Sequence, residues 1–207
     1  TVPFSANDLD TIRHESQHVV QDCIEGIGDN SLVNMMKLDL IVGSGGVLSH
    51  APRRVQSMRM MIDAYAPEGI TAMAVDSIFM MPHLGVLSTV NEEAATEVFD
   101  KDCIIFLGTC IAPTGPMMEG RPAIKVSVKR PDGESIELSV EAGTMESITL
   151  DEDAELEATV TPLQKQLDVG AGPGRAWSGR LRGGIVGLVI DTRGRPIILP
   201  QDQATRT

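Results

Sequence analysis

The sequence predicts an α/β first half, residues 1–116, followed by a mostly antiparallel β domain, residues 117–207, that forms a small barrel or sandwich. In the first half, short apolar runs of strand length alternate with longer segments whose apolar residues follow helical spacing. In the second half, apolar and polar residues alternate within short segments that turn residues separate. The change of pattern near Gly115 to Arg121 sets the predicted boundary.

The first half begins with a predicted helix, residues 9–27, that Asn7 or Asp8 can cap. An apolar strand, "LDLIVG", then enters the turn "GSGGVLSHAP". The helix after this turn ends at Pro67, because proline cannot continue an α-helix. A mixed segment, "AVDSIFMMPHLGVLS", and a capped helix, "NEEAATEVFDKD", come next. The half closes on a second buried strand, "CIIFLGTCIAP".

The second half contains a β-hairpin signal in which "AIKVSVKR" and "ESIELSV" flank the turn Pro131-Asp132-Gly133. Two further strands are predicted in "ESITL" and "AELEATVTPL". The last two strands are "GIVGLVID" and "RPIILP", which the turn "TRGR" joins.

The charge balance excludes two classes of partner. The chain has 29 acidic and 17 basic residues, so its formal net charge is −12. Such a chain is repelled by nucleic acid and by anionic membrane surfaces. The sequence has no apolar run long enough to span a membrane and no signal-peptide pattern, and its three cysteines form no C-x-x-C pair. We therefore expect a cytoplasmic protein with reduced thiols.

A glycine-rich turn follows the first predicted strand. Gly43, Ser44, Gly45 and Gly46 allow positive φ angles and let backbone approach a ligand closely. The next helix would offer unpaired N–H groups to an anion. The pattern is neither G-x-G-x-x-G nor a Walker A sequence, so a nucleotide-binding turn and a plain tight β–α turn are both open. His50 directly follows this turn and could neighbour a ligand.

Residues 170–184 combine glycines with arginines in an otherwise acidic chain. Arg175, Arg180 and Arg182 could bind a phosphate, a carboxylate or an acidic partner surface. Alternatively, this segment is a mobile surface loop whose arginines neutralise the acidic hairpins.

Two further patterns involve histidine. His14, Glu15 and His18 spell H-E-x-x-H, which on a helix can bind zinc and activate water. No strand precedes this helix and no third ligand is evident, so we expect an exposed helix face rather than a zinc site. Asp76 and His83 could form an acid–base pair, but a helix-capping Asp76 and a partly buried His83 are the simpler interpretation.

Four segments carry a family resemblance: "IVGSGGVLS", "AVDSIFMMPHLGVLS", "CIIFLGTCIAP" and "DVGAGPGR…GGIVGLVIDTRGRPIILP". The chain resembles the C-terminal part of the glutamate mutase accessory protein family of the MutL or GlmL type. The glycine turn is also similar to the adenosine motif of the actin/Hsp70/sugar-kinase ATPase superfamily. This resemblance implies an actin-like ATPase subdomain in the first half, and it implies that residues 43–46 face ATP or ADP. It further implies a reactivating, chaperone-like service to a coenzyme B12-dependent mutase.

The resemblance also implies what the chain lacks. ATPases of this superfamily hold Mg²⁺ and position water with an Asp-Gly-x-Thr phosphate loop and a second acidic element, and the chain shows no such loop. We expect it to be the adenosine-side part of a longer protein, without hydrolytic activity by itself. The alternatives are a non-enzymatic protein- or anion-binding module that uses loop 170–184, and a zinc hydrolase that uses residues 14–18.

Overall fold

The structure is a computed structural model that describes residues 33–130 and 133–197. Contacts divide the chain into two units, Thr1–Asn34 and Met35–Thr207, and the fold below is that of the second unit. The helix expected at residues 9–27 lies outside the described residues. So do two residues of the expected hairpin turn, 131–132, and the end of the last expected strand, 198–200.

A mixed five-stranded sheet with the strand order β1-β2-β3-β9-β6 forms the centre of this unit. β1 (Leu40–Gly43) runs parallel to β2 (Gly69–Asp76), and β2 pairs antiparallel with β3 (Ile104–Ala112). β9 (Gly187–Asp191) is parallel to β3, and β6 (Met145–Ile148) closes the edge antiparallel to β9.

A second, antiparallel sheet has the order β5-β4-β7-β8. It consists of β4 (Pro122–Lys129), β5 (Ser135–Glu141), β7 (Glu155–Pro162) and β8 (Trp177–Arg182). In β7, buried residues alternate with more exposed ones, as expected of a sheet that covers a core on one face.

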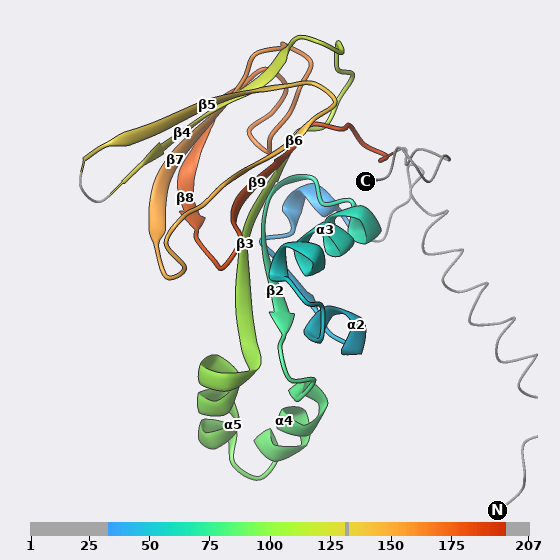
Figure 1. Ribbon diagram of the computed structural model, residues 1–207, viewed down its shortest axis with the longest axis vertical. Helices are drawn as coiled ribbons and strands as arrows, with labels where there is room; N and C mark the ends of the chain where they lie inside the picture. The colour runs from blue at the N-terminus through green and yellow to red at the C-terminus, as the bar shows by residue number, and fades with distance from the viewer. Residues whose placement is uncertain (1–32, 131–132, 198–207) are drawn as a thin grey trace, which may run out of the picture. The chain divides into compact units, whose positions relative to one another are not determined.

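The helices are short, apart from α3 (Arg54–Tyr65), and most of them connect the first three strands. The 3₁₀ turn η1 (Met35–Lys37) precedes β1, and α2 (Gly46–Ser49) follows β1. α4 (Met81–Ser88), α5 (Glu92–Val98) and the π-helical turn η2 (Phe99–Cys103) lie between β2 and β3. In Figure 1, α4 and α5 project beyond the ends of β2 and β3, away from the second sheet. None of the described helices is long and apolar enough to cross a membrane.

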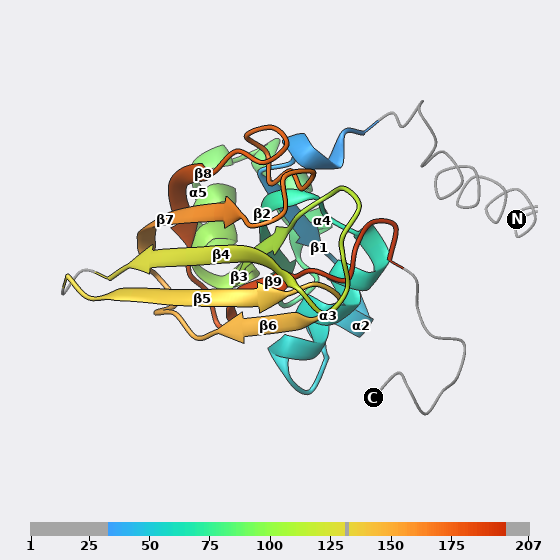
Figure 2. The ribbon, with the colours of Figure 1, turned by 90° about the horizontal axis from the view of Figure 1, so that it is seen from above.

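Two hydrophobic cores lie on opposite faces of the five-stranded sheet. Between the two sheets, Ile111 of β3 and Ile190 of β9 pack with Val126 and Val160 of the second sheet. On the other face, Met58, Met61 and Ile62 of α3 belong to the core that covers Met73 and Leu107. The unit is therefore layered as α3, five-stranded sheet and four-stranded sheet (Figure 1, Figure 2).

The structure differs from the expected division at residues 116 and 117. β6 and β9 come from the second half of the chain, yet they complete the sheet that β1, β2 and β3 begin. Glycine makes this pairing possible: a Cβ on Gly108 of β3 would lie 1.8 Å from the carbonyl oxygen of Gly187 in β9. Two layers thus share one core, and a boundary at 116/117 does not separate them.

Two expected elements are also shorter in the structure. The helix expected over residues 91–102 is α-helical only to Val98 and continues as the π-helical turn η2. Of the last expected strand, the described residues 195–197 are not in a strand. The side chain of Arg195 instead donates to the carbonyl of Pro67 and pairs with Asp191, which takes this segment towards α3.

Candidate functional site

The glycine turn leaves the sheet where the parallel strand β1 ends. Gly43 is the last residue of β1, and a Cβ there would lie 2.6 Å from Leu48 Cδ1 and 2.8 Å from Met61 Sδ. Gly45 has a φ of 123°, a backbone conformation that side chains other than glycine's rarely adopt. The turn therefore needs glycine at 43 for packing and at 45 for backbone conformation.

The backbone of the turn is stabilised from two directions. The amides of Leu48 and Ser49 donate to the carbonyl of Gly45, which begins α2. The carbonyls at the end of α2 accept hydrogen bonds from α3: Arg54 donates to Ser49 O at 3.1 Å, and Ser57 donates to Leu48 O at 2.9 Å. These bonds satisfy carbonyls that a short helix leaves unpaired, and they fix α2 against α3.

An open pocket of about 530 Å³ lies between α2 and α3. Gly46, Val47 and His50 line it from the turn and α2, and Ala51 and Pro52 line it from the connection to α3. The helix α3 contributes four side chains at helical spacing: Gln56, Arg59, Met60 and Asp63. The volume of the pocket falls within the range of small-molecule sites. The pocket lining mixes apolar surface with a few polar groups, as the lining of such sites does.

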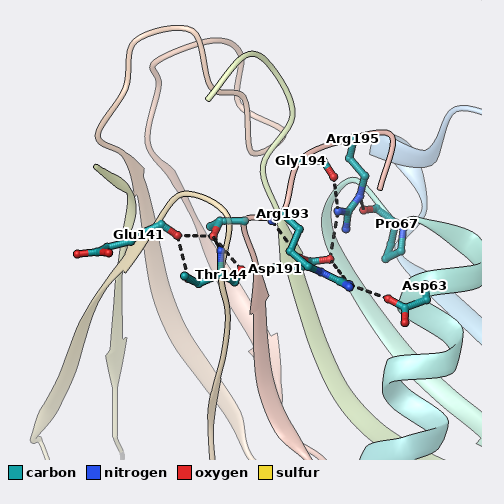
Figure 3. Close-up of polar contacts among 9 residues, drawn as sticks. Asp63, Pro67, Glu141, Thr144, Asp191, Arg193, Gly194 and Arg195 are labelled. Carbon is teal, nitrogen blue, oxygen red and sulfur yellow. Dashed lines mark hydrogen bonds and ion pairs between the residues drawn. The ribbon is translucent and has the colours of Figure 1, made fainter. Parts of the chain in front are cut away.

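One wall of this pocket is held by the segment after β9. Figure 3 shows Arg193 reaching across to Asp63 of α3, with an Nη2–Oδ1 distance of 2.7 Å. The same guanidinium pairs with the buried Asp191 at 2.8 Å through Nε. Burial alone would lower the pKa of Arg193, but the bonds to Asp191 and Asp63 outweigh it and raise the pKa. Arg193 is therefore a fixed cation that sets the position of Asp63.

A second polar cluster joins the glycine turn to α4. The buried carboxylate of Asp76, at the end of β2, accepts hydrogen bonds from Ser44 Oγ at 3.1 Å and from Cys103 Sγ at 3.2 Å. It also accepts from the amides of Met80 and Met81 at the start of α4. Burial raises the pKa of Asp76, but these hydrogen bonds outweigh it and lower the pKa.

The comparisons with known proteins relate part of the chain to a protein family. The model of the family described as MutL protein matches residues 9–103. This part of the chain is similar to the MutL protein family. Searches of curated proteins and of solved structures found no match.

The part that matches the MutL family contains most of the site described above. The glycine turn, the pocket-lining residues of α2 and α3, and Asp76 with α4 all lie between residues 9 and 103. The segments "TCIAP" and "DVGAGPGR" and the β9 region lie beyond the match. The MutL match thus coincides with the pocket, and Arg193, which supports the pocket wall, comes from outside it.

Residues 170–184 are not one loop, because residues 177–182 form β8, and their three arginines lie in different surroundings. Arg175 is exposed in the loop after β7. Arg180 pairs with Glu155 at 3.4 Å on the outer face of the second sheet, and Arg182 lies 3.4 Å from the centre of the Phe106 ring. The loop itself is ordered by Asp168, whose carboxylate accepts from the amides of Gly170 and Gly172. An anion-binding role for these arginines stays a prediction.

The histidine predictions have different outcomes. Residues 14–18 lie outside the described part of the chain, so the H-E-x-x-H pattern stays a prediction. Asp76 does cap α4, as the simpler interpretation expected, whereas His83 is exposed rather than partly buried. His50 lines the pocket. Within residues 33–130 and 133–197, no group of three or more His, Cys, Asp or Glu side chains could hold a metal ion.

Sequence reasoning missed the contribution of α3 to the pocket. Gln56, Arg59, Met60 and Asp63 recur at i, i+3, i+4 and i+7, which places them on one face of the helix. The core face carries Ser57, Met58, Met61 and Ile62. The sequence signal for this was a mostly polar face of the helix, which lies opposite its apolar face and directly follows the glycine turn.

Proposed function

We propose that the chain binds the adenosine part of ATP or ADP in the pocket between α2 and α3, as part of an accessory protein of a coenzyme B12-dependent mutase. The observation that carries the adenosine proposal is the position of the pocket. It opens beside Gly46, so a ligand in it would contact the backbone of the glycine turn. The similarity of residues 9–103 to the MutL family supports the accessory role.

The pocket lining suits an adenine base. Val47, Pro52 and Met60 offer apolar surface to its faces. The planar guanidinium of Arg59 can stack on an aromatic ring. The side-chain amide of Gln56 carries both a donor and an acceptor, which matches the alternating amino group and ring nitrogens of adenine.

Asp63 and the glycine turn suit the sugar and the first phosphate. A carboxylate is a good acceptor for ribose hydroxyls, and Arg193 keeps Asp63 in place at the pocket edge. At Gly45 a Cβ would meet nothing within 4 Å, so no other part of the described chain crowds this residue of the turn. A backbone without side chains there permits close approach.

The proposal stops at adenosine and the adjoining phosphate. It assigns no metal ligand and no hydrolytic step to the described residues. Its own residues would bind and orient the nucleoside, and any phosphate chemistry would need further groups.

Calorimetry with adenosine, ADP and ATP on the 207-residue chain tests the proposal. We expect saturable binding of all three, and we expect Gly46→Leu to abolish it by filling the pocket mouth. A Cβ at Gly46 meets nothing nearer than His50 Nδ1 at 4.0 Å, so this variant should fold. The matched control is Gly85→Leu in α4, where a Cβ also meets open space. Binding that Gly46→Leu leaves unchanged, or no binding at millimolar nucleotide, would overturn the proposal.

The accessory role has a separate test. Size-exclusion chromatography of the chain with glutamate mutase, with and without ATP, should show co-elution in at least one condition. Separate elution in both conditions would contradict a direct service of this chain to the mutase, while leaving the nucleotide proposal standing.

A further inference from the structure

The segment that contains α4 exposes more large apolar side chains than any other described segment of similar length. Ile78 and Phe79 before the helix are 51% and 48% exposed, and Val86 within it is 70% exposed. Leu87 and Val90 continue this exposure to 38% and 86%. These five residues fall within thirteen positions and are called the α4 surface below. Clusters of exposed apolar side chains mark interaction sites.

The α4 surface is not explained by the packing of its own helix. Leu84 is the buried residue of α4, and α4 packs on α5 and η2. Figure 1 shows α4 and α5 standing beyond the ends of β2 and β3, so neither of the two sheets covers them. Phe79 has a φ of 56°, in the left-handed region that is costly for a bulky residue. The backbone of Phe79 is therefore strained, although its ring is half exposed.

The charge next to this surface identifies the kind of partner. Residues 78–103 contain five carboxylates, of Glu92, Glu93, Glu97, Asp100 and Asp102, against one lysine, Lys101. Lys101 is paired with Glu97. The other four carboxylates are exposed. Because α4 packs on α5 and η2, these carboxylates belong to the elements next to the α4 surface. Apolar side chains with carboxylates on adjoining elements are complementary to apolar side chains accompanied by lysine or arginine.

The same charge argues against other occupants. A second copy of this chain would bring its own acidic residues of α5 and η2 and a net charge of −12, so like charges would meet. An anionic membrane surface would be repelled for the same reason.

We propose that the α4 surface is a docking site for a basic amphipathic helix of a partner protein. The helix would lay its apolar side against Val86, Leu87 and Val90, while its lysines or arginines face the carboxylates of α5 and η2. The proposal deepens the accessory role proposed above, on which it rests for the existence of a protein partner. It does not depend on nucleotide binding.

Fluorescence anisotropy of labelled peptides on the 207-residue chain tests the site. The probe is an amphipathic leucine–lysine helix of about 18 residues. A scrambled peptide of the same composition and a leucine–glutamate peptide with the same apolar face are the comparisons. We expect saturable binding of the leucine–lysine helix and binding at least about tenfold weaker for both comparisons.

The deciding variant is Val86→Ser/Val90→Ser, which leaves the charge unchanged. If the apolar surface contributes, affinity for the leucine–lysine helix falls by about tenfold or more. Both side chains are mostly exposed, so the variant should fold, and circular dichroism checks this. The matched control is Leu163→Ser/Ile185→Ser, two apolar residues that are 47% and 42% exposed on other segments. Its affinity should equal that of the unmodified chain.

Three results would overturn the proposal. Equal affinity of the Val86→Ser/Val90→Ser variant would mean that charge alone attracts the peptide. Equal affinity of the leucine–glutamate peptide would remove the complementarity argument. Self-association in sedimentation velocity that this variant abolishes would identify a second copy as the occupant. Because the probe contains neither nucleotide nor mutase, a failure here is distinguishable from a failure of the proposed function.

Discussion

The hydroxyl of Ser44 donates a 3.1 Å hydrogen bond to the buried carboxylate of Asp76. Ser44 belongs to the glycine turn after β1, and Asp76 ends the neighbouring parallel strand β2. The same carboxylate accepts from the first amides of α4. One side chain therefore links the proposed adenosine site to the proposed docking surface.

Asp76→Ala should destabilise the protein by about 2–3 kcal/mol, because it leaves the amides of Met80 and Met81 without their acceptor. Asp76→Asn keeps one carbonyl acceptor and should cost less. Urea unfolding followed by circular dichroism measures both. Asp100→Asn, an exposed carboxyl on η2, is the control and should change the free energy of unfolding by less than about 0.5 kcal/mol. Equal stability of Asp76→Ala and the unmodified chain would contradict the role given to this carboxylate.

The lowered pKa of Asp76 predicts a defined pH dependence. A carboxyl whose pKa is lower in the folded than in the unfolded state adds stability above its unfolded pKa, near 4. That stability is lost as the pH falls through the folded pKa. The stability difference between the unmodified chain and Asp76→Asn should therefore be constant from pH 7 to 5 and shrink below about pH 4. A difference that grows on acidification would mean that the pKa is raised instead.

The two described cysteines should resist alkylation in the folded protein. Burial, together with the hydrogen bond to Asp76, raises the pKa of Cys103 to about 11, and burial raises that of Cys110 to about 12. Both thiols are therefore protonated at pH 8, and the thiolate is the reactive form. Iodoacetamide at pH 8, read by peptide mass spectrometry, should leave both unmodified until guanidinium unfolds the chain. Rapid modification of Cys103 in the native state would indicate that the Asp76 cluster opens.

Local sequence patterns predicted the individual helices, strands and turns better than the contacts between distant parts of the chain. The glycine turn, α3 and the β4–β5 pairing follow from signals within a few residues, and the structure contains each of them. The partners of Asp76 are different, because Ser44 lies 32 residues and Cys103 lies 27 residues away along the chain. The pairing of β9 with β3 is likewise non-local, and periodicity within a strand does not specify which strand it joins.

The contact of β3 with β9 predicts that glycine is required at 108. A Cβ there would overlap the carbonyl of Gly187, and the φ of Gly108, 136°, disfavours other residues. Gly108→Ala should therefore cost at least about 3 kcal/mol or prevent soluble expression. Gly85→Ala is the matched control, because a Cβ at this helical position meets open space and should stabilise α4 by up to about 1 kcal/mol. Normal stability of Gly108→Ala would mean that the two strands can separate without cost.

Arg193 provides the remaining test, because it connects the C-terminal segment to the pocket wall. Arg193→Ala removes the bond to Asp63 and the Nε bond to Asp191, although Arg195 still pairs with Asp191. We expect a loss of about 2 kcal/mol of stability and weaker adenosine binding, since Asp63 loses its fixed position. Arg193→Lys should rescue only in part, because an ammonium group cannot reproduce the fork that reaches both carboxylates. The control is Arg180→Ala, which breaks only the exposed pair with Glu155 and should change neither quantity measurably. If calorimetry finds unchanged adenosine affinity in Arg193→Ala despite lower stability, Asp63 is not a ligand contact, and the sugar must be held by other groups of the pocket.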